Sequence, residues 1–176
     1  SVARVLRRLH PELVFTVNVT SRPPRPHEVE GVDHHFVDEA KFLGLLNTGE
    51  LLEHAEVYGH WYGVPKEQVS DALKRGLDVV ARVDIQGAAT IKRNAPDVIL
   101  VFLEPPSLEE LERRLKGRQT ESEDELAVRL KIAEKEMAES VWFDHVIVND
   151  TDSVEQTARK IFDILARGRT LPRDPF

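Results

Sequence analysis

The chain has 176 residues, of which 41% are hydrophobic and 31% are charged, with a formal net charge of −7 at pH 7 and no cysteine. This length and composition predict one main globular domain with one packed core, which leaves room for inserted lobes but not for a second large domain. They exclude a disulfide framework and a thiolate metal site, and no apolar run is long enough to cross a membrane. The acidic balance argues against broad nucleic-acid binding, so we expect a cytoplasmic protein in which any phosphate recognition is local.

The first part of the chain alternates extended segments with helices. An amphipathic helix is expected in SVARVLRRLHPEL, and the β-branched run at residues 14–20 predicts a strand that ends at a proline-rich loop. The other elements of this part are extended pieces in HHFVD and LLEHAEVYGHWYG and helices in EAKFLGLLNTG and KEQVSDALKRG.

Three short apolar runs in the rest of the chain are typical of parallel strands buried on both faces. They are DVVARVD (78–84), DVILVFL (97–103) and HVIVN (145–149). Helical segments separate them, which indicates an α/β fold with a parallel sheet. Capping-box patterns mark the starts of three further helices: Ser107 with Glu110, Thr120 with Glu123, and Ser153 with Gln156.

The segment TSRPPRPHEVEG places Arg22 and Arg25 on a loop stiffened by prolines. Because proline restricts the backbone, these arginines lose less entropy on gripping a ligand than they would on a glycine-rich turn. Two guanidinium groups suit a phosphate dianion. The alternative is a solvated turn in which the arginines pair with Glu28 and Glu30, and the loop alone does not decide between the two interpretations.

Glu53 lies in an apolar strand context, a few residues before the aromatic cluster Tyr58, Trp61 and Tyr62. A carboxylate can accept two parallel hydrogen bonds from guanine N1–H and the 2-amino group, and adenine offers no such pair of donors. Glu53 is therefore a candidate guanine selector. The alternatives are an edge-strand glutamate that faces water and aromatic side chains that only pack in the core.

Asp84 stands in VDIQGA, at the carboxyl end of a predicted buried parallel strand. Ligands bind at this edge in open α/β sheets, so an acid there is a candidate to hold Mg²⁺-bound water or to orient a nucleophile. The alternative role for Asp84 is to cap the helix that follows.

Three arginines lie in and after the segment ERRLKGRQTESEDELAVRL. Arg114 and Arg118 are i,i+4 neighbours, and Arg129 follows on the next helix. They could form surface salt bridges with the many acids around them. The other interpretation is an arginine-bearing flap over a polyphosphate, because phosphoryl transfer depends on positioning and charge stabilisation.

Five motifs, in order along almost the whole chain, resemble the guanylate kinase family. They are TSRPPRPHEVEGVDHHFV, ELLEHAEVYGHWYGVP, VDIQGA, PPSLEELERRLKGRQTESE and VIVND. The resemblance implies a P-loop nucleoside monophosphate kinase fold, with a three-layer core around a parallel sheet, an inserted GMP-binding lobe and a helical lid. It places the core at residues 1–17, 68–115 and 141–176, the lobe at 18–67 and the lid at 116–140.

By this resemblance the chain transfers the ATP γ-phosphate to GMP, with dGMP left open as an acceptor. Mg²⁺ would be carried by ATP without a direct protein ligand, and Asp84 would approach it through water. The positions that match the family's GMP site are Arg22, Arg25, Tyr62 and His34 for the phosphate and Glu53 and Asn18 for guanine. Those that match the catalytic and ATP side are Asp84, Arg114, Arg118, Arg129 and Asn149.

Four positions depart from the family pattern. His34 stands in place of a tyrosine, Asn18 in place of a serine, Val64 in place of a serine or threonine, and Arg82 in place of an aspartate. Imidazole and amide groups can still donate hydrogen bonds to a phosphate and to guanine O6, whereas the Val64 side chain cannot. We expect none of the four to inactivate the enzyme.

The family's first strand and its G-x-x-x-x-G-K-[ST] loop, which holds the ATP phosphates, would precede Ser1. Ser1 would then fall at or just after the hydroxyl residue of that loop, and we expect the loop in the intact protein. Two alternatives stay open: a catalytically inactive guanylate-kinase-like module that binds GMP or a phosphopeptide, and a kinase for another monophosphate.

Overall fold

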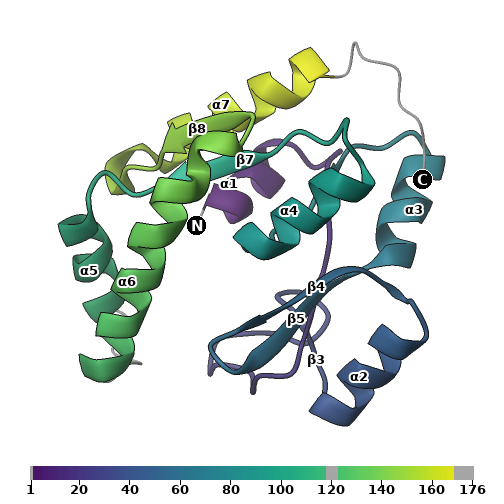
Figure 1. Ribbon diagram of the computed structural model, residues 1–176. Coiled ribbons are helices and arrows are strands. Elements are labelled where there is room, and N and C mark those ends of the chain that lie inside the picture. Colours follow the sequence, from purple (N-terminus) through teal and green to yellow (C-terminus); the bar gives the residue numbers. More distant parts are fainter. Residues whose placement is uncertain (1, 118–122, 169–176) are drawn as a thin grey trace. The chain divides into compact units, whose positions relative to one another are not determined.

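The computed structural model describes residues 2–117 and 123–168. Among these residues the chain forms two compact units, the first from residues 2–9 and 99–168 and the second from residues 10–98. Each unit combines helices with parallel strand pairs, which confirms the predicted α/β class (Figure 1). Within the described residues, no helix is long and apolar enough to cross a bilayer.

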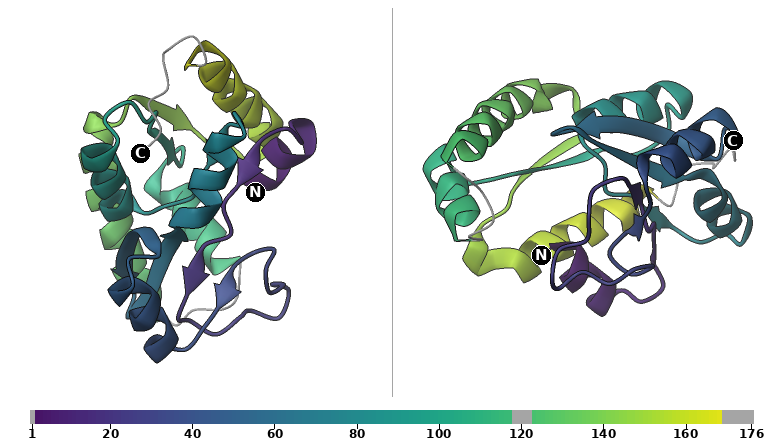
Figure 2. Two further views of the ribbon diagram at one scale, coloured as in Figure 1. Left: turned by 90° about the vertical axis from the view of Figure 1, so that its right-hand side faces the viewer. Right: turned by 90° about the horizontal axis from the view of Figure 1, so that it is seen from below.

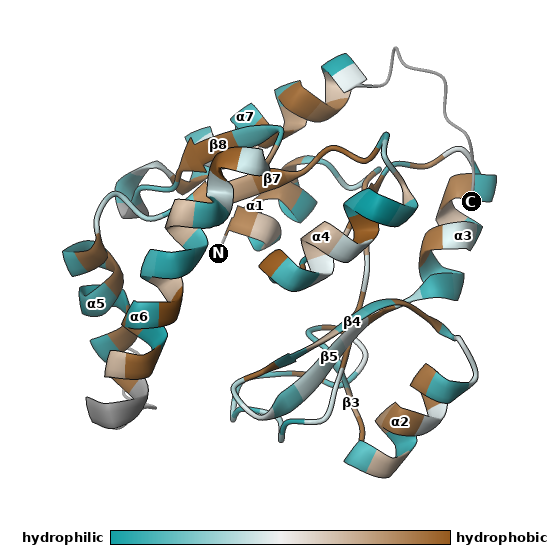
Figure 3. Cartoon of the chain, in the orientation of Figure 1, coloured by the Kyte–Doolittle hydropathy of each residue, from teal (hydrophilic) through white to brown (hydrophobic). Residues whose placement is uncertain are grey.

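The first unit contains one parallel strand pair, β7–β8. Its elements are α1 (Val2–Leu9), β7 (Val101–Glu104), α5 (Leu108–Lys116), α6 (Glu123–Glu139), β8 (His145–Val148) and α7 (Val154–Gly168), with 3₁₀ turns at Ser140–Trp142 and Thr151–Ser153. Helix α1 packs against α7, and α5 packs against α6 (Figure 2). Both strands are largely hydrophobic (Figure 3), but the prediction that they are buried on both faces is wrong, because Leu103, Val146 and Val148 are exposed.

Ser107 is the N-cap of α5, as predicted, because its side chain accepts a hydrogen bond from the Glu110 N–H at 3.2 Å, while the Glu110 carboxylate accepts from Arg113 and Arg114. Helix α7 begins directly after Ser153, as predicted. Thr120, the predicted cap before α6, lies outside the described residues.

The second unit contains a parallel strand pair and a four-stranded sheet. The pair is β1 (Val14–Phe15) with β6 (Val79–Val80), and helices α3 (Lys66–Lys74) and α4 (Ile85–Asn94) belong to the same unit. The four-stranded sheet has the order β3-β2-β5-β4, formed by β2 (Val19–Thr20), β3 (His35–Phe36), β4 (Leu51–Val57) and β5 (His60–Pro65). Strands β2 and β3 are parallel, and the other pairs are antiparallel.

The hairpin between β4 and β5 turns at Tyr58 and Gly59, which have φ angles of 53° and 73°. Two successive positive φ angles are what a two-residue type I′ turn requires, and this turn suits the twist of the flanking strands. The hairpin sets the ladder register, in which Glu53 pairs with Val64 and Ala55 pairs with Tyr62.

Helix α2 (Glu39–Asn47) packs on the sheet face that carries Trp61. The Phe42 side chain is fully buried and stacks on Trp61 with ring centroids 5.8 Å apart. Successive residues of a strand point to opposite faces, so Tyr62 faces away from α2. The register puts Glu53 on the same face as Tyr62, which gives this face its polar groups.

The prediction of a single strand at residues 14–20 is wrong, because β1 ends at Phe15 and β2 begins at Val19 in a different sheet. Between them, the Gln68 side chain replaces a neighbouring strand. Its amide accepts a hydrogen bond from the Val17 N–H at 2.8 Å and donates to the Val17 carbonyl at 3.3 Å. The run at residues 14–20 thus supplies one strand to each of two sheets, and the Gln68 side chain bonds to the backbone between the two strands.

Replacing Gln68 with methionine is expected to destabilise the protein by about 2 kcal/mol, because the Val17 N–H and carbonyl lose their partners in a half-buried position. The measurement is the free energy of unfolding from urea denaturation. Gln86→Met serves as the control, since Gln86 is exposed on α4. Equal stabilities for the two variants would contradict the bridging role of Gln68.

Candidate functional site

The predicted site residues of the second unit fall into two groups. Arg22, Tyr62 and His34 gather beside the proline-rich loop, and Glu53 and Asp84 meet at the start of α4. The polar side chains therefore come from the loop between β2 and β3, from β4 and β5, and from the N-cap of α4.

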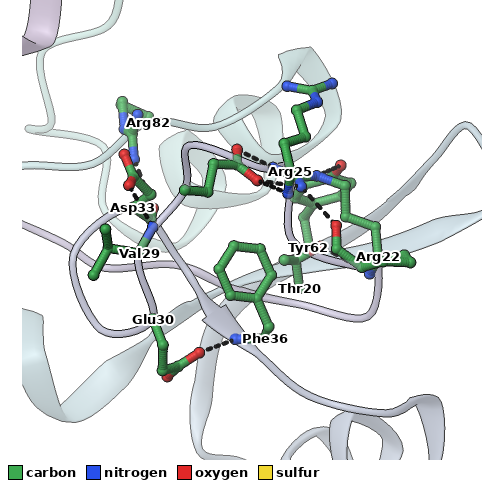
Figure 4. A network of polar contacts seen from close by, with 11 residues as sticks. Thr20, Arg22, Arg25, Val29, Glu30, Asp33, Phe36, Tyr62 and Arg82 are labelled. Carbon is green, nitrogen blue, oxygen red and sulfur yellow. Dashed lines mark hydrogen bonds and ion pairs between the residues drawn. The ribbon is translucent and has the colours of Figure 1, made fainter. Parts of the chain in front are cut away.

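Arg22 is held by four hydrogen bonds. Its Nε donates to the Tyr62 hydroxyl at 3.1 Å, and its two Nη groups donate to both carboxylate oxygens of Glu28 at 2.6 Å each. A fourth bond joins Nη1 to the Pro23 carbonyl at 2.9 Å. Arginine has five N–H donors, so these contacts leave one for a ligand. The guanidinium also lies 5.5 Å from the Phe36 ring centroid (Figure 4).

Glu28 is a structural member of this group that sequence reasoning offered only as an alternative partner. Its hydrogen bonds from Arg22, together with the Arg25 N–H at 2.8 Å, lower the pKa of Glu28 to about 2. The side chains of Glu28 and Arg22 are each only 10% exposed. The predicted pairing of Arg22 with Glu28 is thus present, whereas Glu30 accepts from the Phe36 N–H at 2.8 Å.

The two arginines of the loop differ in their surroundings. The Arg25 guanidinium makes no hydrogen bond to the residues that the structure describes, and Figure 4 shows it extending away from the Arg22 network. Four of the five N–H donors of the Arg22 side chain are used in bonds to its own loop and to Tyr62. The guanidinium N–H groups of Arg25 are therefore the ones available to bind an anion.

His34 lies between two aromatic rings, 5.7 Å from Phe36 and 6.1 Å from Tyr62 by ring centroids. Burial lowers the pKa of His34, and the charges of Arg22 and Arg82 add to this effect. Its Nδ1 is buried and has no hydrogen-bond partner among the described residues. The imidazole is therefore mainly neutral at pH 7, and its buried Nδ1 is unpaired within the described part of the chain.

Glu53 is 4% exposed, which rules out the alternative of an edge-strand glutamate facing water even though β4 is an edge strand. Burial raises the pKa of Glu53 to about 7, the Asp84 charge adds to the rise, and the Val64 N–H opposes it. The neighbouring Val64 side chain is fully buried and offers no hydrogen bond.

Asp84 caps α4, since its Oδ1 accepts a hydrogen bond from the Gly87 N–H at 2.9 Å. The alternative role as a helix cap is thus confirmed, and a role near the reacting groups stays a prediction. One carboxylate oxygen is engaged in the cap.

Asn18 is buried with its amide engaged on both sides. Its Oδ1 accepts from the Thr16 hydroxyl at 2.9 Å, and its Nδ2 donates to the Arg82 carbonyl at 2.6 Å. One Nδ2 hydrogen remains for a ligand, so contact with guanine stays a prediction. The Arg82 side chain donates to the Asp33 carbonyl at 3.1 Å, at the far end of the loop.

In the first unit, Arg114 is half-buried and joins two elements. Its Nε donates to Glu110 at 2.8 Å within α5, and its Nη2 donates to the Asn149 carbonyl at 2.9 Å after β8. The Asn149 Oδ1 is buried without a partner in the described part of the chain. Arg129 lies half-buried on α6, while Arg118 and Ser1 lie outside the described residues.

The family model described as guanylate kinase matches residues 3–167. A guanylate kinase of Synechococcus sp. (strain JA-3-3Ab) is 46% identical over 91% of this chain and 73% of its own length, and one of Thermobifida fusca is 44% identical over 97% and 86%. The crystal structure of guanylate kinase from Anaplasma phagocytophilum superposes with a TM-score of 0.82 at 36% identity, covering 96% of this chain and 82% of that one. The chain therefore belongs to the guanylate kinase family, a family of enzymes that phosphorylate GMP with ATP.

Proposed function

We propose that the protein transfers the γ-phosphate of ATP to GMP, giving GDP and ADP. The observation that carries this proposal is a buried carboxylate, Glu53, on the same sheet face as the Tyr62 hydroxyl and the Arg22 network. A purine nucleotide laid on this face would meet a carboxylate at its base and cationic donors at its phosphate.

Glu53 would recognise guanine through its two oxygens, which accept from N1–H and the 2-amino group. Both bonds need the ionised form, because a protonated carboxyl loses an acceptor and gains a donor. Asn18 would add its remaining Nδ2 hydrogen at guanine O6. Because these contacts involve only the base, dGMP would be accepted as well as GMP.

Arg25 would supply the main ionic contact to the GMP phosphate, with one N–H from Arg22. The Tyr62 oxygen already accepts from Arg22 Nε, which directs the hydroxyl hydrogen elsewhere and makes it available to a phosphate oxygen. His34 would complete the set by taking up a proton when the phosphate binds, because Nδ1, which has no partner among the described residues, then carries a hydrogen that it can donate to a phosphate oxygen.

The ATP side would draw on the first unit and on Ser1. Arg114, Arg118 and Arg129 would neutralise charge on the transferring phosphoryl group, and Asn149 would contact adenine. The buried unpartnered Asn149 Oδ1 supports the last assignment, because an amide oxygen can accept from the adenine amino group. We keep the domain division as part of this proposal: a GMP-binding lobe at residues 18–67, a lid at 116–140, and a core formed by residues 1–17, 68–115 and 141–176.

Mg²⁺ would be held mainly by the phosphate oxygens of ATP. Among residues 2–117 and 123–168 there is no group of three His, Cys, Asp or Glu side chains that could bind a metal ion. Asp84 has one oxygen beyond its cap bond, which fits contact through a metal-bound water. Bound with ATP, the metal would neutralise charge on the β- and γ-phosphates.

The test is nucleoside diphosphate formation by the purified protein from ATP, Mg²⁺ and GMP, with dGMP, AMP and UMP in parallel reactions. We expect phosphorylation of GMP and dGMP alone. Absence of GDP would refute the kinase activity, and equal use of AMP would refute guanine selection by Glu53.

The raised pKa of Glu53 predicts a pH dependence of GMP use. Below pH 7 the carboxyl is protonated, so kcat/KM for GMP is expected to fall, approaching about tenfold per pH unit. Stability changes in the opposite direction: the folded pKa lies above the ordinary value of 4.5, so the folded chain binds more protons between pH 4.5 and 7. This group's contribution to stability therefore decreases as pH rises through that window.

Steady-state rates from pH 5.5 to 8.5, together with urea denaturation at the same pH values, would measure both effects. Glu53→Gln is the control, because its residual activity and its stability should lack this titration. A GMP profile that stays flat down to pH 5.5 would contradict the assignment.

A further inference from the structure

The carboxylate of Glu53 lies directly against the backbone of Gly87 in the first turn of α4. A Cβ added at residue 87 would overlap Glu53 Oε2 and would lie 2.9 Å from Glu53 Cδ. The same Cβ would come within 3.1 Å of Asp84 Oδ1. Contacts shorter than 3.0 Å to a Cβ are not tolerated, so any side chain at residue 87 would force the carboxylate to move.

Two groups beside the Glu53 carboxylate are held in place. Asp84 is fixed by its cap bond to the Gly87 N–H, and the Val64 side chain opposite Glu53 is fully buried. The second unit holds this arrangement together because α4 packs against β4. A Cβ at residue 87 would therefore push the Glu53 carboxylate away from α4, and its two oxygens would no longer lie where they would accept hydrogen bonds from guanine.

Gly87 has a regular helical position rather than a positive φ, so backbone conformation does not require glycine there. Glycine inside a helix costs about 1 kcal/mol relative to alanine, and a residue that only had to form the helix would not be glycine by preference. The need for close approach by Glu53 accounts for it.

We propose that Gly87 is a positioning residue for guanine recognition. Because Gly87 has no side chain, the Glu53 carboxylate can lie against the α4 backbone, in the position from which it would accept hydrogen bonds from the base. We call this space beside Gly87 the seat. This inference rests on the proposed role of Glu53 and adds to it a residue that touches no substrate. The seat also explains why Glu53 is buried although β4 is an edge strand, because the carboxylate lies against the first turn of α4.

The experiment uses Gly87→Ala with Gly44→Ala as the matched control. Gly44 lies inside α2, and a Cβ there would meet nothing within 4 Å. Gly44→Ala should raise Tm by about 2–4 °C from helix propensity and leave the kinetics unchanged. Gly87→Ala should raise KM for GMP by about tenfold or more, with KM for ATP unchanged within twofold.

The decisive variant combines Gly87→Ala with Glu53→Asp, because the shorter side chain withdraws the carboxylate from the space that the new Cβ occupies. Glu53→Asp alone should weaken GMP use, yet in the Gly87→Ala background it should lower KM for GMP about threefold or more. A residue with a merely structural role would not show this rescue. If Gly87→Ala does not fold, restored folding in the double variant supports the seat, and failure to restore it overturns the proposal.

The outcomes distinguish a failure of the proposed GMP kinase activity from a failure of the proposed role of Gly87. If the wild-type protein does not phosphorylate GMP, the proposed function fails. The seat is then tested by thermal unfolding of the wild type and the three variants of the cycle, where a Tm of the double variant no higher than that of Gly87→Ala overturns it. If the wild-type protein is active and Gly87→Ala keeps its KM for GMP within twofold, the seat is refuted and the proposed function stands.

Discussion

Glu53→Gln is expected to raise KM for GMP by about 10–100-fold and to reduce the preference for GMP over AMP by a similar factor. Glutamine has nearly the same shape, but its amide group replaces one acceptor by a donor that faces the donors of guanine. The effect is large because Glu53 is buried, so no water is at hand to satisfy the mismatched groups. Competition between GMP and AMP in one reaction measures the change in preference.

The same variant should be more stable than the wild type above pH 7, by up to about 3 kcal/mol, because the neutral amide avoids burying a charge beside Asp84. Higher stability with poorer GMP use would separate a binding defect from misfolding. Unchanged preference between GMP and AMP, at any stability, would show that another group reads the base.

Glu28→Ala is expected to destabilise the protein by about 3 kcal/mol, since it leaves the Arg22 guanidinium buried without its bidentate partner. The side chains concerned are each 10% exposed, and the lost bonds are both 2.6 Å long. GMP binding should weaken as well, because the Arg25 N–H also loses its acceptor and the loop that presents Arg25 is no longer fixed.

Glu30→Ala provides the control from the same loop. Its carboxylate accepts from the Phe36 N–H and pairs with His35, but its side chain is 62% exposed, so the expected loss is below about 1 kcal/mol. Urea denaturation of both variants gives the comparison. Equal losses would mean that the burial of the Arg22–Glu28 pair adds nothing to its contribution.

The sequence predicts the elements around the site better than it predicts how they meet. Local capping patterns anticipate the start of α5 at Ser107 and the second role offered for Asp84, because a cap needs only a few neighbouring residues. The break in the predicted strand at residues 14–20 depends instead on Gln68, which is distant in the chain. No periodicity in a β-branched run reveals that a remote amide will occupy its hydrogen-bonding edge.

Glu53 shows the same limit within the candidate site. Its residue type and strand context indicate a guanine selector, but its burial follows from contact between β4 and α4. The proline-rich loop likewise supports two interpretations of its arginines, and the structure shows Arg22 in the predicted ion pair with Glu28. Which arginine has its donors available depends on how the loop folds back, and residue spacing does not contain that information.

The stacking of Trp61 on Phe42 has a spectroscopic consequence. The chain has two tryptophans: Trp61 lies in the second unit, and Trp142 lies in the first, packed on Phe143 with ring centroids 4.4 Å apart. Replacing either tryptophan with phenylalanine leaves a single tryptophan, so tryptophan emission then follows the melting of the unit that contains it. Trp61 also adjoins Tyr62 in β5 and points to the opposite sheet face, so if GMP binds at Tyr62 as proposed, we expect Trp61 emission to change on binding without direct contact.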